Sequence, residues 1–167
     1  MIFVTVGTHE QPFDRLLKCI DKMVEKGQIN EKVVVQKGFT DYEPKNCESY
    51  KLIPYDDMQK YINEARIVIT HGGPASFIAP LTIGKIPIVV PRKKEFNEHV
   101  NNHQLDFAKE VEKRNGNIIV AETDDEIVNA VLDYNNIIQK LSNSNASNNK
   151  KFNELLQIEI EKMLGDK

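Results

Sequence analysis

The sequence lacks the features that mark several large classes of protein. It has only two cysteines, Cys19 and Cys47, in 167 residues, too few for a disulfide framework or a cysteine-rich metal site. Basic residues (22 Lys and Arg) do not outnumber acidic ones (25 Asp and Glu), and the formal net charge is -3, which argues against a nucleic-acid-binding surface. The apolar runs are far shorter than the ~20 residues of a membrane-spanning helix. We expect Cys19, in a helical segment, and Cys47, in a loop, to be free thiols.

The amino terminus also lacks the basic flank and the cleavage site of a signal peptide. Residues 2–6 read Ile-Phe-Val-Thr-Val, which is typical of a strand, so we expect the chain to stay in the cytoplasm. Apolar residues make up 40% of the sequence. A chain of this length and composition is expected to form one domain with a hydrophobic core.

Strand-like runs alternate with segments of helical spacing along most of the chain. Strands are expected at 2–6, 32–36, 50–53, 67–70, 88–90 and 117–120, and helices at 13–26, 56–64, 75–83, 101–114 and, as one or two helices, 124–141. This alternation predicts an α/β fold, namely a Rossmann-like parallel sheet of about six strands with helices on both faces. Ligands of such sheets bind at the carboxyl ends of the strands.

The last part of the chain has a different composition. Residues 1–141 are expected to form the Rossmann-like domain, and the polar run 142–149 (SNSNASNN) a flexible linker. Residues 150–167 then carry apolar side chains at helical spacing. Such a helix either docks on its own domain or binds a partner.

One glycine-containing segment is especially informative. Residues 70–76 read Thr-His-Gly-Gly-Pro-Ala-Ser, between a β-branched run at 67–69 and an apolar stretch at 77–83. Strand, glycine turn and helix in this order form an anion site, because glycine lets the backbone approach a ligand and the helix start offers free N–H groups. The usual anion is a phosphate. The alternative is a purely structural turn.

Two further loops follow strands and are expected at the same edge of the sheet. In the first, Gly7 permits close approach and Thr8 can donate a hydrogen bond. His9 is either a polar ligand contact or an exposed loop histidine without a role. In the second, Lys37 precedes Gly38 and either adds positive charge near a phosphate or is simply solvated.

Four segments in order resemble a known family: VGTHEQPFD (6–14), THGGPAS (70–76), GKIPIVVPR (84–92) and EHVNNHQ (98–104). Together they are similar to the C-terminal, donor-binding half of the GT-B glycosyltransferases that make lipid II, a family 28-like domain. They are closer still to the separate soluble subunit of split enzymes. Those enzymes include the eukaryotic dolichol-linked UDP-GlcNAc transferase and bacterial capsule and exopolysaccharide glycosyltransferase pairs.

This resemblance implies a glycosyltransferase subunit that uses a UDP-sugar, with UDP-galactose expected by analogy with capsule systems. A membrane-anchored partner would supply the acceptor half and recruit the chain to the inner face of the membrane. The acceptor would be a lipid-diphosphate-linked glycan, and the length of the chain fits such a half-enzyme. The alternatives are a glucosyl- or N-acetylglucosaminyltransferase subunit and a non-catalytic nucleotide-sugar-binding module. Formation of a homo-oligomer stays open.

The resemblance also implies roles for particular residues. The turn at 70–76 would bind the diphosphate through backbone N–H groups and the Ser76 hydroxyl, and so stabilise UDP as it leaves. The backbone around Tyr55 would read the uracil edge, and Met58 would pack on its face. That segment is also compatible with a plain helix start capped by Asp56.

The segment 91–104 would bind the ribose and the donor sugar. Asn102, His103 and Gln104 could hydrogen-bond to sugar hydroxyls, and Arg92 could pair with a phosphate. The complete set of expected UDP-sugar contacts is Gly7, Thr8, His9, Gly38, Tyr55, Met58, His71, Gly72, Gly73, Ala75, Ser76, Arg92, His99, Asn102, His103 and Gln104.

No metal and no cofactor are expected. The sequence has no Asp-x-Asp pair, which favours a metal-free transfer. His99 and His103 are four residues apart and could face one metal on a helix, but no third ligand is evident. The base that takes the acceptor proton is expected on the partner, with His9 the candidate in this chain. The stretch 77–82 lacks the acid that contacts ribose in the peptidoglycan enzymes, so ribose binding must differ.

Overall fold

Six parallel strands form a single sheet in the computed structural model, which describes residues 1–145. Their order is β3-β2-β1-β4-β5-β6. The strands are β1 (Ile2–Thr5), β2 (Val33–Gln36), β3 (Glu48–Tyr50), β4 (Ile67–His71), β5 (Ile88–Val90) and β6 (Ile119–Val120). The predicted α/β class with about six parallel strands is confirmed.

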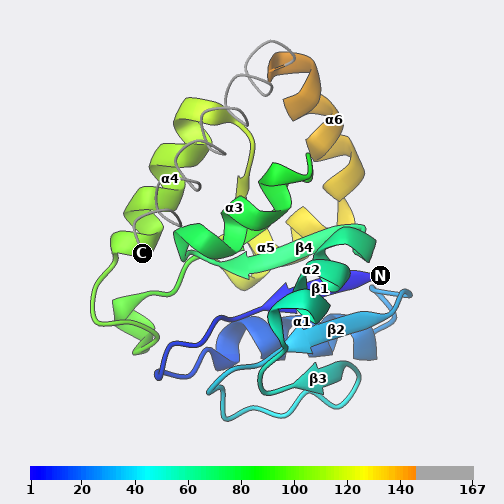
Figure 1. Cartoon of the computed structure of the whole chain (residues 1–167), viewed down its shortest axis with the longest axis vertical. Coiled ribbons are helices and arrows are strands. Elements are labelled where there is room, and N and C mark those ends of the chain that lie inside the picture. The colour runs from blue at the N-terminus through cyan, green and yellow to red at the C-terminus, as the bar shows by residue number, and fades with distance from the viewer. Residues whose placement is uncertain (146–167) are drawn as a thin grey trace.

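Helices cover both faces of this sheet (Figure 1). They are α1 (Asp14–Glu25), α2 (Tyr55–Glu64), α3 (Pro74–Thr82), α4 (His103–Asn115), α5 (Asp124–Leu132) and α6 (Tyr134–Asn145), with a short 3₁₀ helix η1 (Lys94–Phe96). Side chains of α1, α5 and α6 pack on one face, and those of α2, α3 and α4 pack on the other.

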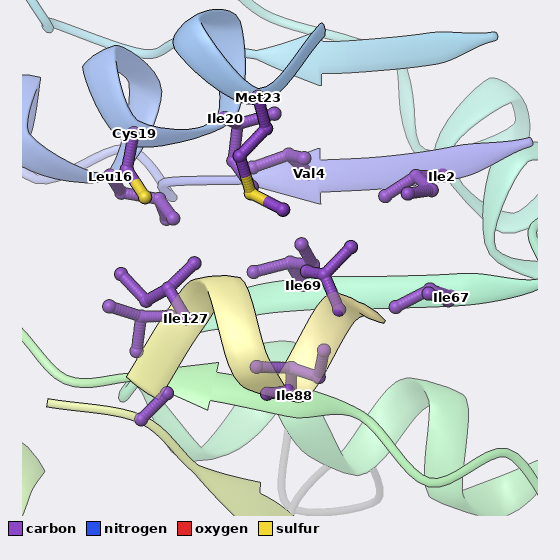
Figure 2. Packing of buried hydrophobic residues seen from close by; sticks show 14 of the residues in the cluster. Ile2, Val4, Leu16, Cys19, Ile20, Met23, Ile67, Ile69, Ile88 and Ile127 are labelled. Atoms are coloured by element: carbon purple, nitrogen blue, oxygen red, sulfur yellow. The ribbon is translucent and has the colours of Figure 1, made fainter. Parts of the chain in front are cut away.

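The strands are apolar because the sheet is buried on both sides. Successive residues of a strand point to opposite faces, so Ile2 and Val4 join the core under α1 while Phe3 joins the core under α2. Figure 2 shows the first of these cores, where Ile67 and Ile69 of β4 lie beside the β1 side chains. A strand covered on both faces reads as a continuous hydrophobic run, which explains why these runs could be recognised.

The strand order reverses beside β1, and this places the site. From β1 the chain moves outward to β2 and β3, then returns to lay β4 on the other side of β1. The loops after β1 and β4 therefore lead away in opposite directions and leave a crevice at the carboxyl edge. Thr5 and Thr70 are register partners at the ends of these two strands.

Two local expectations are wrong. β3 is Glu48–Tyr50 rather than residues 50–53, because Tyr50 already pairs with Gln36, the last residue of β2. Ile53 is buried not in a strand but against Phe3 and the α2 side of the core. In addition, α2 begins at Tyr55, and Asp56 lies in its first turn without making a side-chain cap.

At the C-terminal end, α6 continues to Asn145. The first residues of the expected linker 142–149 are therefore helical, and the rest of it, with the expected helix at 150–167, lies outside the described residues. Within residues 1–145, no helix combines the length and the apolar character needed to cross a membrane.

The end of α2 is held by a lysine that is distant in sequence. The Nζ of Lys85 donates to the backbone carbonyls of Ile62, Asn63 and Ala65 at 2.7, 2.5 and 2.6 Å. The last carbonyls of a helix lack partners within the helix and carry its negative dipole end. The ammonium therefore satisfies them and ties α2 to the turn before β5.

We expect Lys85→Met to lower the free energy of unfolding by about 1–2 kcal/mol, measured by urea denaturation. Lys32→Met is the matched control, because it removes a surface ion pair with Glu48, worth about 0.5 kcal/mol or less. Equal losses in the two variants would contradict the capping role.

Candidate functional site

Glycines from three loops pack together at the carboxyl edge of the sheet, and two of them lie against the ring of His71. Gly7 (φ +75°) follows β1, Gly38 (φ +55°) follows β2 and Gly73 follows β4. A Cβ on Gly7 would lie 2.4 Å from His71 Cε1, and one on Gly73 would lie 2.5 Å from His71 Nε2. A Cβ on Gly38 would lie 2.4 Å from the carbonyl oxygen of Gly7. No side chain fits at Gly7, Gly38 or Gly73, so the loops can approach each other this closely only with glycine at these positions.

The turn after β4 also packs on the segment that precedes α4. A Cβ on Gly72 would lie 2.8 Å from Gln104 Cβ and 3.2 Å from Pro91 Cα. Two of the segments that resemble the family, 70–76 and 98–104, are thus in contact through a glycine.

The N-terminus of α3 is open at the same place. Pro74 is its first residue, and Gly73 precedes it without a side-chain cap. Within residues 1–145 the backbone N–H groups of Gly73 and Ala75 donate no hydrogen bond, whereas that of Ser76 donates to the Gly73 carbonyl at 3.0 Å. Free N–H groups together with the positive end of the helix dipole make an anion site. Because the Ser76 N–H is already engaged within the turn, the free backbone donors here are those of Gly73 and Ala75.

The imidazole of His71 is neutral in this environment. Burial, and next the positive charge of Arg92, lowers its pKa to about 4. Its Nε2 lies 3.5 Å from the Ser76 hydroxyl. A neutral ring can offer one N–H donor and one acceptor, so near neutral pH His71 can hydrogen-bond to an anion without bringing a charge.

Arg92, which was expected as a partner for a phosphate, is buried away from the crevice. Its side chain is 0% exposed, and its guanidinium stacks over the ring of Phe13 at 4.8 Å. Nη1 donates to the carbonyls of Gln11 (2.7 Å) and Glu98 (3.0 Å), and Nη2 donates to the carbonyl of Val6 (2.8 Å). The guanidinium therefore holds backbone and does not face a phosphate, because the apolar body of Phe13 and the carbonyls enclose it.

Glu98 is a buried acid to which the sequence analysis assigned no role. It accepts from Nε and Nη2 of Arg15 at 3.0 and 3.1 Å and from the backbone N–H of Lys93 at 3.0 Å. Arg15 also donates to the carbonyl of Pro91. The sequence did point to this residue, because Glu98 begins the EHVNNHQ segment. It did not reveal the pairing, because the partner Arg15 is 83 residues away in sequence.

His9 and His99 face each other across the crevice, with ring centroids 4.7 Å apart. Nδ1 of His9 accepts from the backbone N–H of Gln11 (3.1 Å), and Nδ1 of His99 accepts from that of Asn101 (3.4 Å). In the neutral rings the proton is therefore on Nε2. Burial, then the charges of His99 and Arg92, lowers the pKa of His9.

His99 and His103, considered as a possible metal pair, do not lie on one helix, because α4 begins only at His103. No group of three or more His, Cys, Asp or Glu side chains that could hold a metal lies among the described residues.

The remaining expected contacts occupy varied positions. The side chain of Asn102 accepts from the Lys94 backbone N–H at 2.8 Å, and Gln104 Oε1 accepts from that of Arg92 at 3.4 Å, so both shape the 91–104 segment. His103 is exposed at the start of α4. In the first turn of α2, Tyr55 is 73% exposed and Met58 is partly buried against the core.

The loop after β2 is held by a buried acid that the sequence analysis missed. Asp21 of α1 is 3% exposed and accepts from the Tyr42 hydroxyl (2.7 Å) and from the backbone N–H groups of Lys45 (3.1 Å) and Asn46 (2.7 Å). The available signal was an acid on the apolar face of α1. Lys37 in the same loop pairs with Glu43, so its ammonium is not free.

A pocket of about 310 Å³ lies away from these loops, at the amino ends of the strands, and Ile2, Ile29 and Leu132 help to line it. Its charged side chains, Glu31 and Arg66, pair with each other. It lacks the close glycine approach and the open helix start found at the carboxyl edge, so we place the site at the carboxyl edge.

A family model and curated proteins match most of this chain. The glycosyltransferase family 28 C-terminal domain matches residues 1–158. The UDP-N-acetylglucosamine transferase subunit ALG13 of Homo sapiens is 34% identical over 121 residues, 67% of this chain and 10% of that protein. ALG13 of Yarrowia lipolytica is 28% identical over 135 residues, 74% of this chain and 66% of that protein.

Solved structures share the fold. The glycotransferase of kitacinnamycin superposes with a TM-score of 0.57 at 17% identity, covering 93% of this chain and 42% of that one. The glycosyltransferase SnogD from Streptomyces nogalater gives a TM-score of 0.53 at 19% identity, covering 92% and 43%. The chain spans only a tenth of the length of its human relative. The family model, however, matches nearly all of this chain, which therefore belongs to the glycosyltransferase family 28 C-terminal domains.

Proposed function

We propose that the chain is the donor-binding part of a glycosyltransferase that transfers a sugar from a UDP-sugar. The observation that carries this proposal is the open N-terminus of α3 beside Gly7 and His71, at the point where the strand order reverses. Such a site suits a diphosphate, because it offers backbone donors and a positive dipole at close range.

In this proposal the diphosphate lies between the loop after β1 and the turn after β4. The free N–H groups of Gly73 and Ala75, the Ser76 hydroxyl and the neutral His71 ring donate hydrogen bonds to it. Negative charge grows on UDP as the glycosidic bond to it breaks, and donors fixed in advance stabilise that charge. The chain then needs no metal for the transfer.

The base and the sugar would extend on either side of the diphosphate. Uracil would lie near Tyr55 and Met58, where an exposed ring and a thioether are available at the start of α2. The sugar would lie along the segment 99–104. Because the curated relatives are named for UDP-N-acetylglucosamine, we place that donor ahead of the UDP-galactose predicted by analogy with capsule systems.

The acceptor and its base would come from another protein. The relatives are named as subunits, which supports a partner protein. From the resemblance described above, we propose that this partner is membrane-anchored and brings a lipid-diphosphate-linked glycan, as in capsule or exopolysaccharide synthesis. His9 remains the candidate base within this chain, because its lowered pKa favours the neutral form that a base requires. It would take the proton on Nδ1 and so would have to give up the hydrogen bond that Nδ1 accepts from the Gln11 N–H.

We expect the intact chain to bind UDP saturably without added metal in isothermal titration calorimetry. The affinities of UDP-N-acetylglucosamine, UDP-galactose and UDP-glucose are then compared, and the UDP-sugar that binds most tightly is identified as the donor. Ser76→Ala is expected to weaken UDP binding about tenfold, because it removes one hydrogen bond to a charged group. Ser49→Ala, in the outer strand β3, is the control and should bind as the unmodified chain does. A chain that binds none of these nucleotides would overturn the assignment.

A further inference from the structure

We infer that Arg92 is a positioning residue, which holds the loop 6–12 and the segment 91–99 in one arrangement that receives the diphosphate of the donor. This inference rests on the proposed function for the identity of the ligand. Its structural part concerns only the two loops on either side of the crevice.

One guanidinium binds both ends of the loop after β1. Nη2 donates to the carbonyl of Val6, directly before Gly7, and Nη1 donates to the carbonyl of Gln11 at the other end. The residues between them include His9, whose ring faces His99 on the other segment. Because both ends are tied to a group from the far side of the crevice, the loop cannot move without displacing Arg92.

The same guanidinium holds its own segment. Nη1 also donates to the Glu98 carbonyl, and the Glu98 carboxylate is held by the side chain of Arg15 and the backbone N–H of Lys93. His99, the next residue, then packs against His9, with the two rings tilted relative to each other. The two rings thus lie on two segments that one buried cation joins.

The geometry requires arginine. A guanidinium presents five N–H donors in a planar fork, whereas an ammonium is a point charge on a flexible stem. The Val6 and Gln11 carbonyls are bound by different nitrogens of Arg92. A lysine would retain the positive charge, but its single nitrogen could not reach both carbonyls in the same way.

The buried charge also acts on the site. Arg92 is among the causes that lower the pKa of both His71 and His9, so its field reaches the crevice from beneath. The Glu98 carboxylate is engaged by Arg15, which leaves the Arg92 charge only partly offset. A diphosphate above the crevice would be attracted by that charge without touching it.

The experiment compares Arg92→Lys with Arg66→Lys. Arg66 lies at the opposite edge of the sheet, where it pairs with Glu31, so its variant controls for the chemical change alone. Each variant is first shown to be folded by circular dichroism and thermal unfolding. UDP affinity is then measured by calorimetry, and amide hydrogen exchange is followed in residues 6–12 and in β2.

We expect Arg92→Lys to weaken UDP binding by up to about a hundredfold, as small misplacements of binding groups do, and to speed exchange in residues 6–12 while β2 stays protected. Arg66→Lys should change neither. A general structural role would instead raise exchange throughout the sheet. A folded Arg92→Lys with normal UDP affinity and a protected loop would overturn the inference.

If Arg92→Lys does not fold, Glu98→Gln carries the test. This variant keeps Arg92 but weakens the ion pair between residue 98 and Arg15. UDP affinity should therefore fall severalfold, and amide exchange in residues 6–12 should become faster. No change in either would overturn the inference. If the unmodified chain fails to bind UDP, the proposed function falls, and the exchange measurement alone decides whether Arg92 holds the loop.

Discussion

Replacing Gly7 with alanine is expected to weaken UDP binding by about a hundredfold. The new Cβ would lie 2.4 Å from Cε1 of His71, closer than any real contact, so either the loop or the ring must move. The ring is confined on its other side by Gly73. Both elements that we propose to contact the diphosphate are therefore displaced together, and isothermal titration calorimetry with UDP measures the loss.

Gly84 supplies a matched control for this variant. Its φ of +76° is almost the same as the +75° of Gly7, but nothing lies within 4 Å of a Cβ added there. Both alanine variants should lose about 1–2 kcal/mol of stability from the left-handed backbone conformation, whereas only Gly7→Ala should lose UDP affinity. Equal UDP affinity in the two variants would contradict the placement of the site.

Asp21→Asn is expected to lower the free energy of unfolding by about 2–3 kcal/mol at pH 7, since it replaces a buried charged acceptor of three hydrogen bonds. Burial raises the pKa of this carboxyl, but the hydrogen bonds from Tyr42, Lys45 and Asn46 outweigh burial, and the pKa lies below its usual value. Urea denaturation at several pH values measures the effect.

The lowered pKa fixes the sign of the pH dependence. The carboxyl contributes stability that is fully present above its unfolded pKa of about 3.9 and is lost as the pH falls through the lower folded value. The difference between the natural chain and Asp21→Asn should therefore be constant near neutrality and shrink below about pH 4. Asp41→Asn, at an exposed position in the same loop, should show neither effect. A difference that grows on acidification would contradict this role.

The secondary structure could be predicted largely because the sheet is buried on both faces. Ile88–Val90 was located correctly, and so were the helices around Leu16 and Ile127. The failures occurred where an apolar residue is buried without being in a strand. Ile53 is such a residue, since it follows the end of β3 in the chain and packs on the side of the core that α2 covers.

The candidate site could be predicted at its glycines and much less at its charged residues. Gly7, Gly38 and Gly73 each follow a strand, and the rule for parallel sheets brings them to one edge. Arg92 was expected as a partner for a phosphate but is fully buried, and the roles of Glu98 and Asp21 in holding loops were not predicted. Their partners come from distant parts of the chain, and no local pattern reports such a pairing.

The sequence by itself determined the fold class, the edge of the sheet at which the candidate site lies and the glycine turn before α3. These depend on local signals, namely apolar periodicity and the few residues that can form a close turn before a helix. Only the tertiary structure decided which side chains face the crevice and which hold it in shape. Burial and charge pairing are properties of the assembled chain, so the role of Arg92 became evident only when the carbonyls of Val6 and Gln11 were found around it.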